Sequence, residues 1–215
     1  MRDITLRALD ILKQVDVIVA EDTRVSRKLL SAYDIHTPLK SYHDFNKERI
    51  TPLLINLLKE GQAIALISDA GTPGISDPAF YIVREAIRNG LVVEAIPGAT
   101  AFVPALILSG LPTDRFVFEG FLPAKKGRSK RLEQLRQEDR TIIFYEAPHR
   151  LLRTLRDIFR TLGDRQVAVS RELTKKFEQV VRGRLSEVAE YFEKNSPRGE
   201  FVIVVHGIDR KEITQ

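Results

Sequence analysis

Short apolar runs alternate along this sequence with segments whose apolar residues recur every three or four positions. The runs predict strands at residues 15–20, 63–67, 91–96, 116–118, 141–145, 166–170 and 201–205. Between them, the apolar spacing predicts amphipathic helices around residues 6–12 and 50–58. Such alternation is typical of α/β proteins, so we expect mostly parallel sheets.

The length of 215 residues suits two compact domains, each able to bury a core. Turn-forming residues cluster in segment 109–114, after an apolar helix and before a new strand. We therefore predict an N-terminal α/β domain over residues 1–112 and a C-terminal α/β domain over residues 113–215.

Composition excludes several classes of protein and of site. The sequence has no cysteine, which rules out disulfides, thiolate catalysis and cysteine-type zinc sites. It has neither an apolar run of eighteen residues nor a signal peptide, so we expect a cytoplasmic protein. The four histidines, at positions 36, 43, 149 and 206, lack metal-ligand spacing, and we predict no metal. A net charge of +5 permits an acidic partner without requiring one.

Two loops rich in small residues follow predicted strands. Residues 68–78 read Ser-Asp-Ala-Gly-Thr-Pro-Gly-Ile-Ser-Asp-Pro, where glycines allow a sharp turn, Asp77 or Ser76 caps the next helix, and Pro78 occupies its first turn. Residues 97–101 read Pro-Gly-Ala-Thr-Ala. Ligands of open α/β sheets bind beyond strand C-termini, so the two loops predict one shared site. The alternatives are a tight turn without a ligand and close packing of a helix on its strand.

Polar segments follow three further strands. In 144–150, Tyr145 suits contact with a base or adenine, Glu146 accepts hydrogen bonds and Arg150 suits a phosphate. His149 is a candidate general base, or else a surface or capping residue. Segment 21–24 either lines the site or forms the N-terminus of a helix. Segment 170–177 either lines the site or forms an ion-paired turn on the surface.

The densest positive segment is 125–131, Lys-Lys-Gly-Arg-Ser-Lys-Arg. Because it follows a strand end, we expect Lys125, Lys126, Arg128 and Lys130 to contact the phosphates of a nucleic acid. The alternative is a solvated loop without a partner. In that case the path of the nucleic acid would run near Arg24, Arg150 and Lys175.

Together these segments carry a resemblance to a known family. The motifs are Glu-Asp-Thr-Arg at 21–24, Ser-Tyr-His at 41–43, the loop 68–78, Ser-Gly-Leu-Pro-Thr-Asp-Arg-Phe at 109–116, Phe-Tyr-Glu-Ala-Pro-His-Arg at 144–150 and Arg-Glu-Leu-Thr-Lys at 171–175. Through nearly the whole chain, they resemble bacterial methyltransferases of small-subunit ribosomal RNA, which belong to the tetrapyrrole methylase superfamily.

The resemblance implies two α/β domains, S-adenosylmethionine in the cleft between them, a homodimer, and methylation of a cytidine ribose 2′-hydroxyl in small-subunit (16S) RNA. It places cofactor contacts on Asp69, Gly71, Thr72, Pro73, Ile75, Thr100, Ala101, Tyr145, Ala147 and Leu173. It also implies a first strand with a Thr-Pro-Ile-Gly-Asn loop ahead of segment 3–7. The sequence begins at Met1, so we expect that element to be missing.

Methyl transfer from a sulfonium needs alignment of the acceptor oxygen and exclusion of water, and a base assists a weakly nucleophilic hydroxyl. The candidates for this base are Asp22, Asp69, Glu146, His149 and Lys175. Two other functions stay open. One is methylation of a tetrapyrrole or another small molecule, since a fold does not fix a substrate. The other is RNA binding without catalysis.

Overall fold

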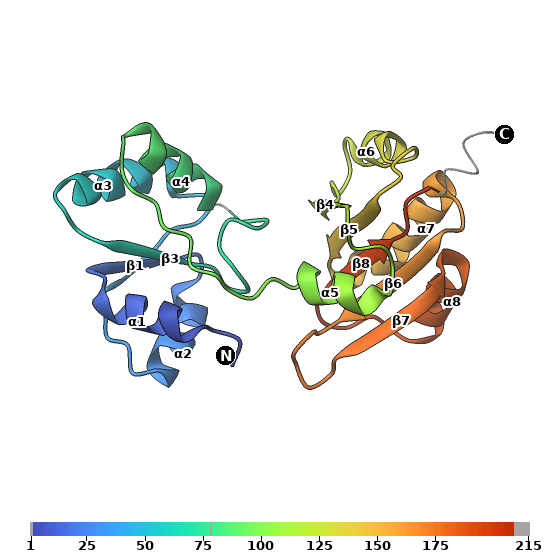
Figure 1. Cartoon of the computed structure of the whole chain (residues 1–215), viewed down its shortest axis with the longest axis horizontal. Coiled ribbons are helices and arrows are strands. Elements are labelled where there is room, and N and C mark those ends of the chain that lie inside the picture. Colours follow the sequence, from blue (N-terminus) through green and yellow to red (C-terminus); the bar gives the residue numbers. More distant parts are fainter. Residues whose placement is uncertain (1, 78, 209–215) are drawn as a thin grey trace. The chain divides into compact units, whose positions relative to one another are not determined.

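A computed structural model describes residues 2–77 and 79–208, which form two compact units divided between Thr100 and Ala101 (Figure 1). This division comes earlier than the predicted boundary at residue 112. The reason is helix α5 (Phe102–Ser109), whose Ala105 and Leu106 pack with Ile143 of the C-terminal sheet. The apolar helix therefore belongs to the second unit.

The N-terminal unit holds a three-stranded parallel sheet with the order β2-β1-β3. Its elements are α1 (Leu6–Gln14), β1 (Val17–Ala20), α2 (Thr23–Ala32), β2 (Leu39–Ser41), α3 (Lys47–Lys59), β3 (Ile64–Ile67) and α4 (Ala79–Arg88). All four residues of β1 are buried, as befits the central strand of a parallel sheet with both faces covered. The short strand β2 was not predicted from the sequence.

The predicted strand at 91–96 does not form. This segment has no regular secondary structure, and the Val92 side chain is 86% exposed. A strand needs a partner for its backbone groups, and among the described strands β3 pairs only with β1. The apolar run at 91–96 was therefore insufficient to specify a strand. Ahead of α1, residues 2–5 also form no strand.

The C-terminal unit holds a five-stranded sheet with the order β4-β5-β8-β6-β7. Its elements after α5 are β4 (Phe116–Phe121), α6 (Arg128–Gln134), β5 (Thr141–Glu146), the 3₁₀ helix η1 (Pro148–Arg150), α7 (Leu151–Leu162), β6 (Gln166–Arg171), β7 (Gln179–Arg184), α8 (Leu185–Lys194) and β8 (Phe201–Val205). Only β4 and β5 pair in parallel, so the expectation of mostly parallel sheets is wrong for this unit. The cause is β7, an unpredicted strand that forms an antiparallel pair with β6, together with β8, which runs antiparallel to both its neighbours.

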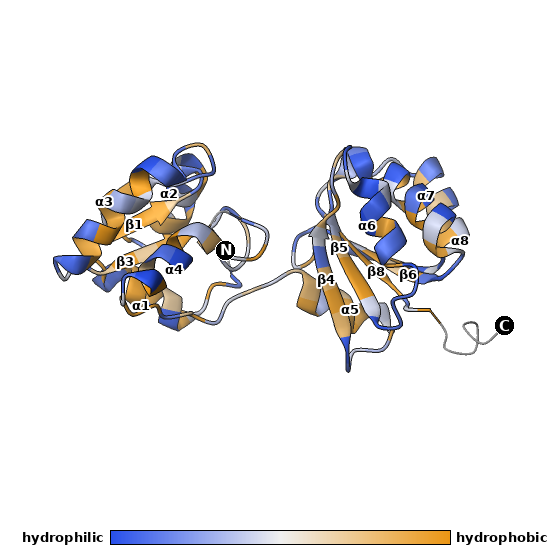
Figure 2. Ribbon diagram, turned by 90° about the horizontal axis from the view of Figure 1, so that it is seen from above, coloured by the Kyte–Doolittle hydropathy of each residue, from blue (hydrophilic) through white to orange (hydrophobic). Residues whose placement is uncertain are grey.

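Both faces of the second sheet are covered by apolar contacts. On one face, a cluster from α6, α7 and α8 packs on alternate residues of β5, β6 and β8, including Phe144, Val169 and Ile203. On the other face, α5 packs on Ile143 and Val204. Figure 2 shows the apolar strands between these helices. The alternation explains why β8 is buried at every position and reads as a continuous apolar run.

Two further observations concern the part of the chain that the structure describes. None of its helices is long and apolar enough to cross a membrane. In the same residues, no group of three or more histidine, aspartate or glutamate side chains gathers in a way that would hold a metal ion.

Candidate functional site

The two predicted glycine loops meet within the N-terminal unit. The Thr72 hydroxyl donates a hydrogen bond of 2.9 Å to the carbonyl oxygen of Ala99. Gly71 has a φ of +75°, and a Cβ built on it would lie 3.3 Å from that same oxygen. A Cβ on Gly98 would lie 2.9 Å from the Thr72 hydroxyl. Bare backbone at both glycines therefore permits the close approach of the two loops.

A second turn shapes the end of the longer loop. The Asp77 carboxylate accepts hydrogen bonds from the backbone N–H groups of Gly74 and Ala79, at 2.8–2.9 Å. Of the two candidates for the cap of α4, Asp77 thus fills the role, whereas Ser76 adopts a φ of +67° in the turn. Pro78 lies outside the described residues.

At the end of β1, neighbouring carboxylates have different environments. Asp22 caps α2 by accepting from the Arg24 backbone N–H at 2.8 Å, and its carboxylate also pairs with the Arg24 guanidinium. Hydrogen bonds from Arg24 lower the pKa of Asp22 to about 2. The Asp22 backbone N–H donates to Asp69 at 3.1 Å, which joins this strand end to the loop after β3.

Glu21, which the sequence reasoning did not single out, has the opposite environment. Partial burial raises the pKa of the Glu21 carboxyl, and the negative charges of Asp69, Asp77 and Asp44 raise it further. Glu21 also lines a small cavity with Tyr42 and Ser68. It is thus a carboxyl group at the glycine loops whose proton affinity is increased.

Asp22 gives a pH-dependent contribution to stability. Its folded pKa lies below the ordinary value of 3.8, so the contribution is fully present above that value and is lost as the pH falls through about 2. We expect Asp22→Asn to keep the helix cap and to remove this contribution. The stability difference between wild type and variant should therefore shrink as the pH falls from 4 to 2, as measured by urea unfolding. A difference that is constant over this range would contradict the assignment.

Glu146, at the end of β5, belongs to a buried network. Its carboxylate accepts hydrogen bonds from the Thr154 hydroxyl and the Ala147 backbone N–H, and it pairs with Arg150 at 3.3 Å. Thr154 accepts in turn from Arg128 at 2.7 Å. Each oxygen of Glu146 thus has a partner inside the protein, which favours a structural role over proton transfer.

Arg128 extends this network to the basic loop. Its guanidinium is buried, forms an ion pair of 2.7 Å with Asp157 and donates to the Pro123 carbonyl oxygen. By contrast, Lys125, Lys126 and Lys130 are exposed and form no ion pair within the described ranges. Arg128 therefore anchors the loop, while the three lysines present its positive charge to solvent.

The remaining candidate site residues have different environments. His149 is exposed, and Lys175 forms ion pairs with Glu172 and Glu200, which raise its pKa and keep it protonated. Tyr145 and Leu173 both pack against the apolar cluster under α5. The other cofactor and RNA candidates lie at or near the surface, namely Pro73, Ile75, Thr100, Ala101, Ala147, Arg24 and Arg150.

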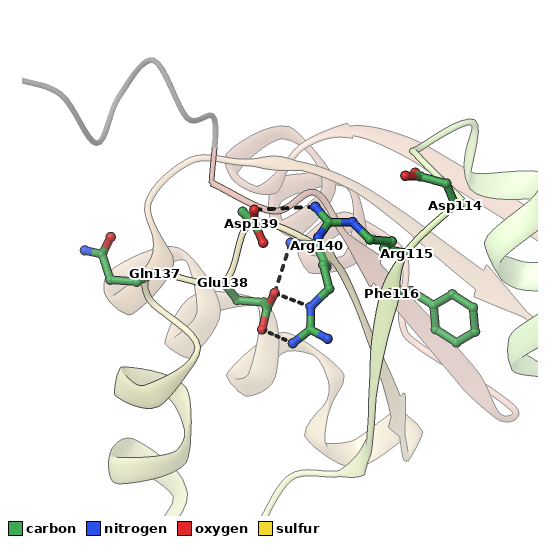
Figure 3. A pocket seen from close by; sticks show the side chains of 7 residues that line it. All are labelled: Asp114, Arg115, Phe116, Gln137, Glu138, Asp139 and Arg140. Carbon is green, nitrogen blue, oxygen red and sulfur yellow. Dashed lines mark hydrogen bonds and ion pairs between the residues drawn. The ribbon is translucent and has the colours of Figure 1, made fainter.

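A larger surface pocket, of about 690 Å³, lies at the N-terminal ends of β4 and β5 (Figure 3). Its lining carries two arginines, but Arg140 forms hydrogen bonds of 2.7 Å to Glu138, and Arg115 lies 3.6 Å from Asp139. These charges neutralise one another within the pocket. Because ligands of α/β sheets bind at strand C-termini, we do not assign the site here.

Comparisons with known proteins show the family to which the chain is related. A family model described as Tetrapyrrole (Corrin/Porphyrin) Methylases matches residues 1–189. Ribosomal RNA small subunit methyltransferase I of Thermotoga maritima is 46% identical over 96% of this chain and 93% of that protein. The proteins of the same name from Bacillus subtilis and Synechocystis are 50% and 54% identical, over 100% and 95% of this chain and 74% of each relative.

Solved structures share the fold. A cobalt precorrin-4 methyltransferase of cobalamin biosynthesis superposes with a TM-score of 0.70 at 18% identity, covering 95% of this chain and 89% of its own. A uroporphyrin-III C-methyltransferase from Thermus thermophilus, solved with S-adenosylhomocysteine, gives 0.64 at 23% identity, covering 95% and 91%.

Proposed function

The chain belongs to the tetrapyrrole methylase family, and from this membership we propose that it transfers a methyl group from S-adenosylmethionine to a cytidine ribose 2′-hydroxyl of small-subunit (16S) ribosomal RNA. The observation that carries the substrate is the 46–54% identity to ribosomal RNA small subunit methyltransferase I over nearly the whole chain. The solved relative with S-adenosylhomocysteine, the demethylated form of the cofactor, supports the methyl donor.

The glycine loops fit such a cofactor. Gly71 lies in the loop after β3 and Gly98 in the irregular segment after α4, and a Cβ on either would press on Ala99 or Thr72. Small residues at this position leave room for an adenosine or methionine moiety, and bare backbone suits hydrogen bonds to it. We assign cofactor contacts to this loop pair. When bound there, S-adenosylmethionine supplies an electrophilic methyl group.

The protein's own task is to align the acceptor oxygen and take up its proton. Of the carboxyl groups near the glycine loops, Glu21 has the raised pKa, whereas hydrogen bonds from Arg24 hold the Asp22 carboxylate in its ionised form. A carboxylate with increased proton affinity accepts a hydroxyl proton more readily as that bond breaks. Glu21 is therefore the proposed proton acceptor, in place of the candidates predicted from the sequence.

The exposed lysines supply the contact with RNA. Neutralising Lys125, Lys126 and Lys130 to glutamine should weaken RNA binding and lower the slope of log affinity against log salt by roughly 0.7 to 0.9 for each phosphate that the loop no longer binds. Arg128 is left unchanged because its charge is buried against Asp157. The measurement is binding to small subunits at several salt concentrations. A wild-type slope in the triple variant would show that the loop is solvated surface.

The decisive experiment is transfer of tritiated methyl groups to small subunits that lack this modification. We expect radioactivity in the ribosomal RNA and 2′-O-methylcytidine after digestion to nucleosides. Methylation of a tetrapyrrole instead would reject the RNA substrate. RNA binding without S-adenosylmethionine binding in calorimetry would identify a non-catalytic RNA-binding protein.

Two further properties belong to this proposal. We infer a homodimer, on the strength of the sequence motifs shared with the family, and light scattering of the purified protein tests it. We also infer a cytoplasmic location, because the proposed substrate is ribosomal RNA.

A further inference from the structure

We propose that a pocket at the outer edge of β4 holds one unpaired nucleotide of the RNA, with its base stacked on Phe121 and its phosphate near Lys130. This inference rests on the proposed function and adds a binding subsite to it. The pocket has a volume of about 450 Å³, within the range of small-molecule sites. The residues that line it are Phe118, Glu119, Phe121, Leu122, Pro123, Gly127, Lys130, Arg131 and Gln134.

The backbone of β4 explains why aromatic rings line this edge. Among the described strands β4 pairs only with β5, and the pairing shifts register between Phe118 and Gly120. This bulge changes the alternation of side chains, so that Phe118 and Phe121 both pack edge-on against Tyr145, at 5.0 and 5.6 Å between ring centroids. Phe121 is held by Tyr145 yet remains 51% exposed, which makes it a preformed stacking surface.

Charge around the pocket favours a polyanion. Arg131 forms two hydrogen bonds of 2.6 Å to Glu119, whose side chain is only 4% exposed. The one carboxylate in the lining is thereby neutralised and does not repel a phosphate. Lys130 is left without an ion pair among the described residues, and Lys125 and Lys126 stand in the adjoining loop.

The loop between β4 and α6 is fixed from beneath. The buried Arg128 donates to the Pro123 carbonyl, and the partly buried Arg150 donates to that of Leu122, so both residues of the pocket wall are held by side chains beneath them. A preformed pocket binds with a smaller entropic cost than one that must close. An exposed ring beside lysines suits a single-stranded segment, whose bases are accessible for stacking, better than a duplex.

The test compares two single-stranded RNA decamers of equal length and charge, one with its bases and one abasic, in fluorescence anisotropy. Wild type should bind the decamer that has bases roughly tenfold more tightly, because stacking adds to the phosphate contacts. Phe121→Leu should lose most of this preference, and Phe121→Trp should restore it. Lys130→Gln should lower the affinity for both decamers by the same factor.

Phe159→Leu is the matched control, since Phe159 is similarly exposed but lies on α7, outside the pocket. An unchanged preference in Phe121→Leu, or an equal loss in Phe159→Leu, would overturn the pocket. Methyl transfer by wild type is measured in parallel. If wild type transfers methyl groups but Phe121→Leu keeps the preference for the decamer with bases, the pocket is rejected and the proposed reaction stands. A Phe121-dependent preference without methyl transfer rejects the proposed reaction and leaves the pocket as an RNA subsite.

Discussion

Gly71→Val is expected to weaken S-adenosylmethionine binding at least roughly a hundredfold, about 2.7 kcal/mol. Gly71 has a φ of +75°, a conformation that β-branched residues scarcely adopt. Its new Cβ would also lie 3.3 Å from the Ala99 carbonyl oxygen, and the two methyl groups of valine extend further. The loop pair would have to separate, which removes the surface proposed for the cofactor. Isothermal titration calorimetry measures the affinity.

Gly90→Val is the matched control for backbone strain. Gly90 belongs to the same unit and has a φ of +70°, but nothing lies within 4 Å of a Cβ built there. Both variants should lose similar stability in thermal unfolding, whereas only Gly71→Val should lose affinity. Titrations are made at a temperature where circular dichroism shows both variants folded. Wild-type affinity in Gly71→Val would place the cofactor elsewhere.

The sequence predicted where polar segments follow strands, because apolar runs and turn residues are local signals. The loop after β3 and the segment after β5 both lie where the pattern put them. The failure at 91–96 shows the limit of such signals, since an apolar run does not say whether a strand lies beside it. Strand β7 was missed for the opposite reason: its sequence Gln-Val-Val-Arg-Gly-Arg is half polar and lies at a sheet edge.

Charged residues were harder to interpret than strands. Arg128 and Lys130 stand two positions apart in one basic segment, yet Arg128 is 4% exposed and Lys130 faces solvent. Arg128 is buried because it donates hydrogen bonds to Asp157 and Thr154 of α7, a helix that is distant in the sequence. Glu146 was likewise indistinguishable from a site carboxylate until Thr154 was seen to bind it. Sequence gives the charge of a residue, while its burial and partners depend on tertiary packing.

Glu21→Gln is expected to lower kcat by roughly 10² to 10⁴, the range that a positioned base contributes. A base acts in its deprotonated form, so wild-type activity should fall as the pH drops through the pKa of Glu21, which lies above its ordinary value of 4.5. The variant should lose this acid limb and keep its affinity for S-adenosylmethionine. The measurement is single-turnover methyl transfer to small subunits between pH 4.5 and 8.

Asp44→Asn tests the electrostatic cause separately from the chemistry. The negative charge of Asp44 is one of those that raise the pKa of Glu21, so its removal should move the acid limb to lower pH and leave the plateau rate unchanged. Glu146→Gln should instead lower the stability of the C-terminal unit, since it disturbs the buried bonds to Thr154 and Arg150. If Glu21→Gln kept both the plateau and the acid limb while Glu146→Gln lost the acid limb without losing stability, the proton would go to Glu146, and the assignment of Glu21 would be wrong.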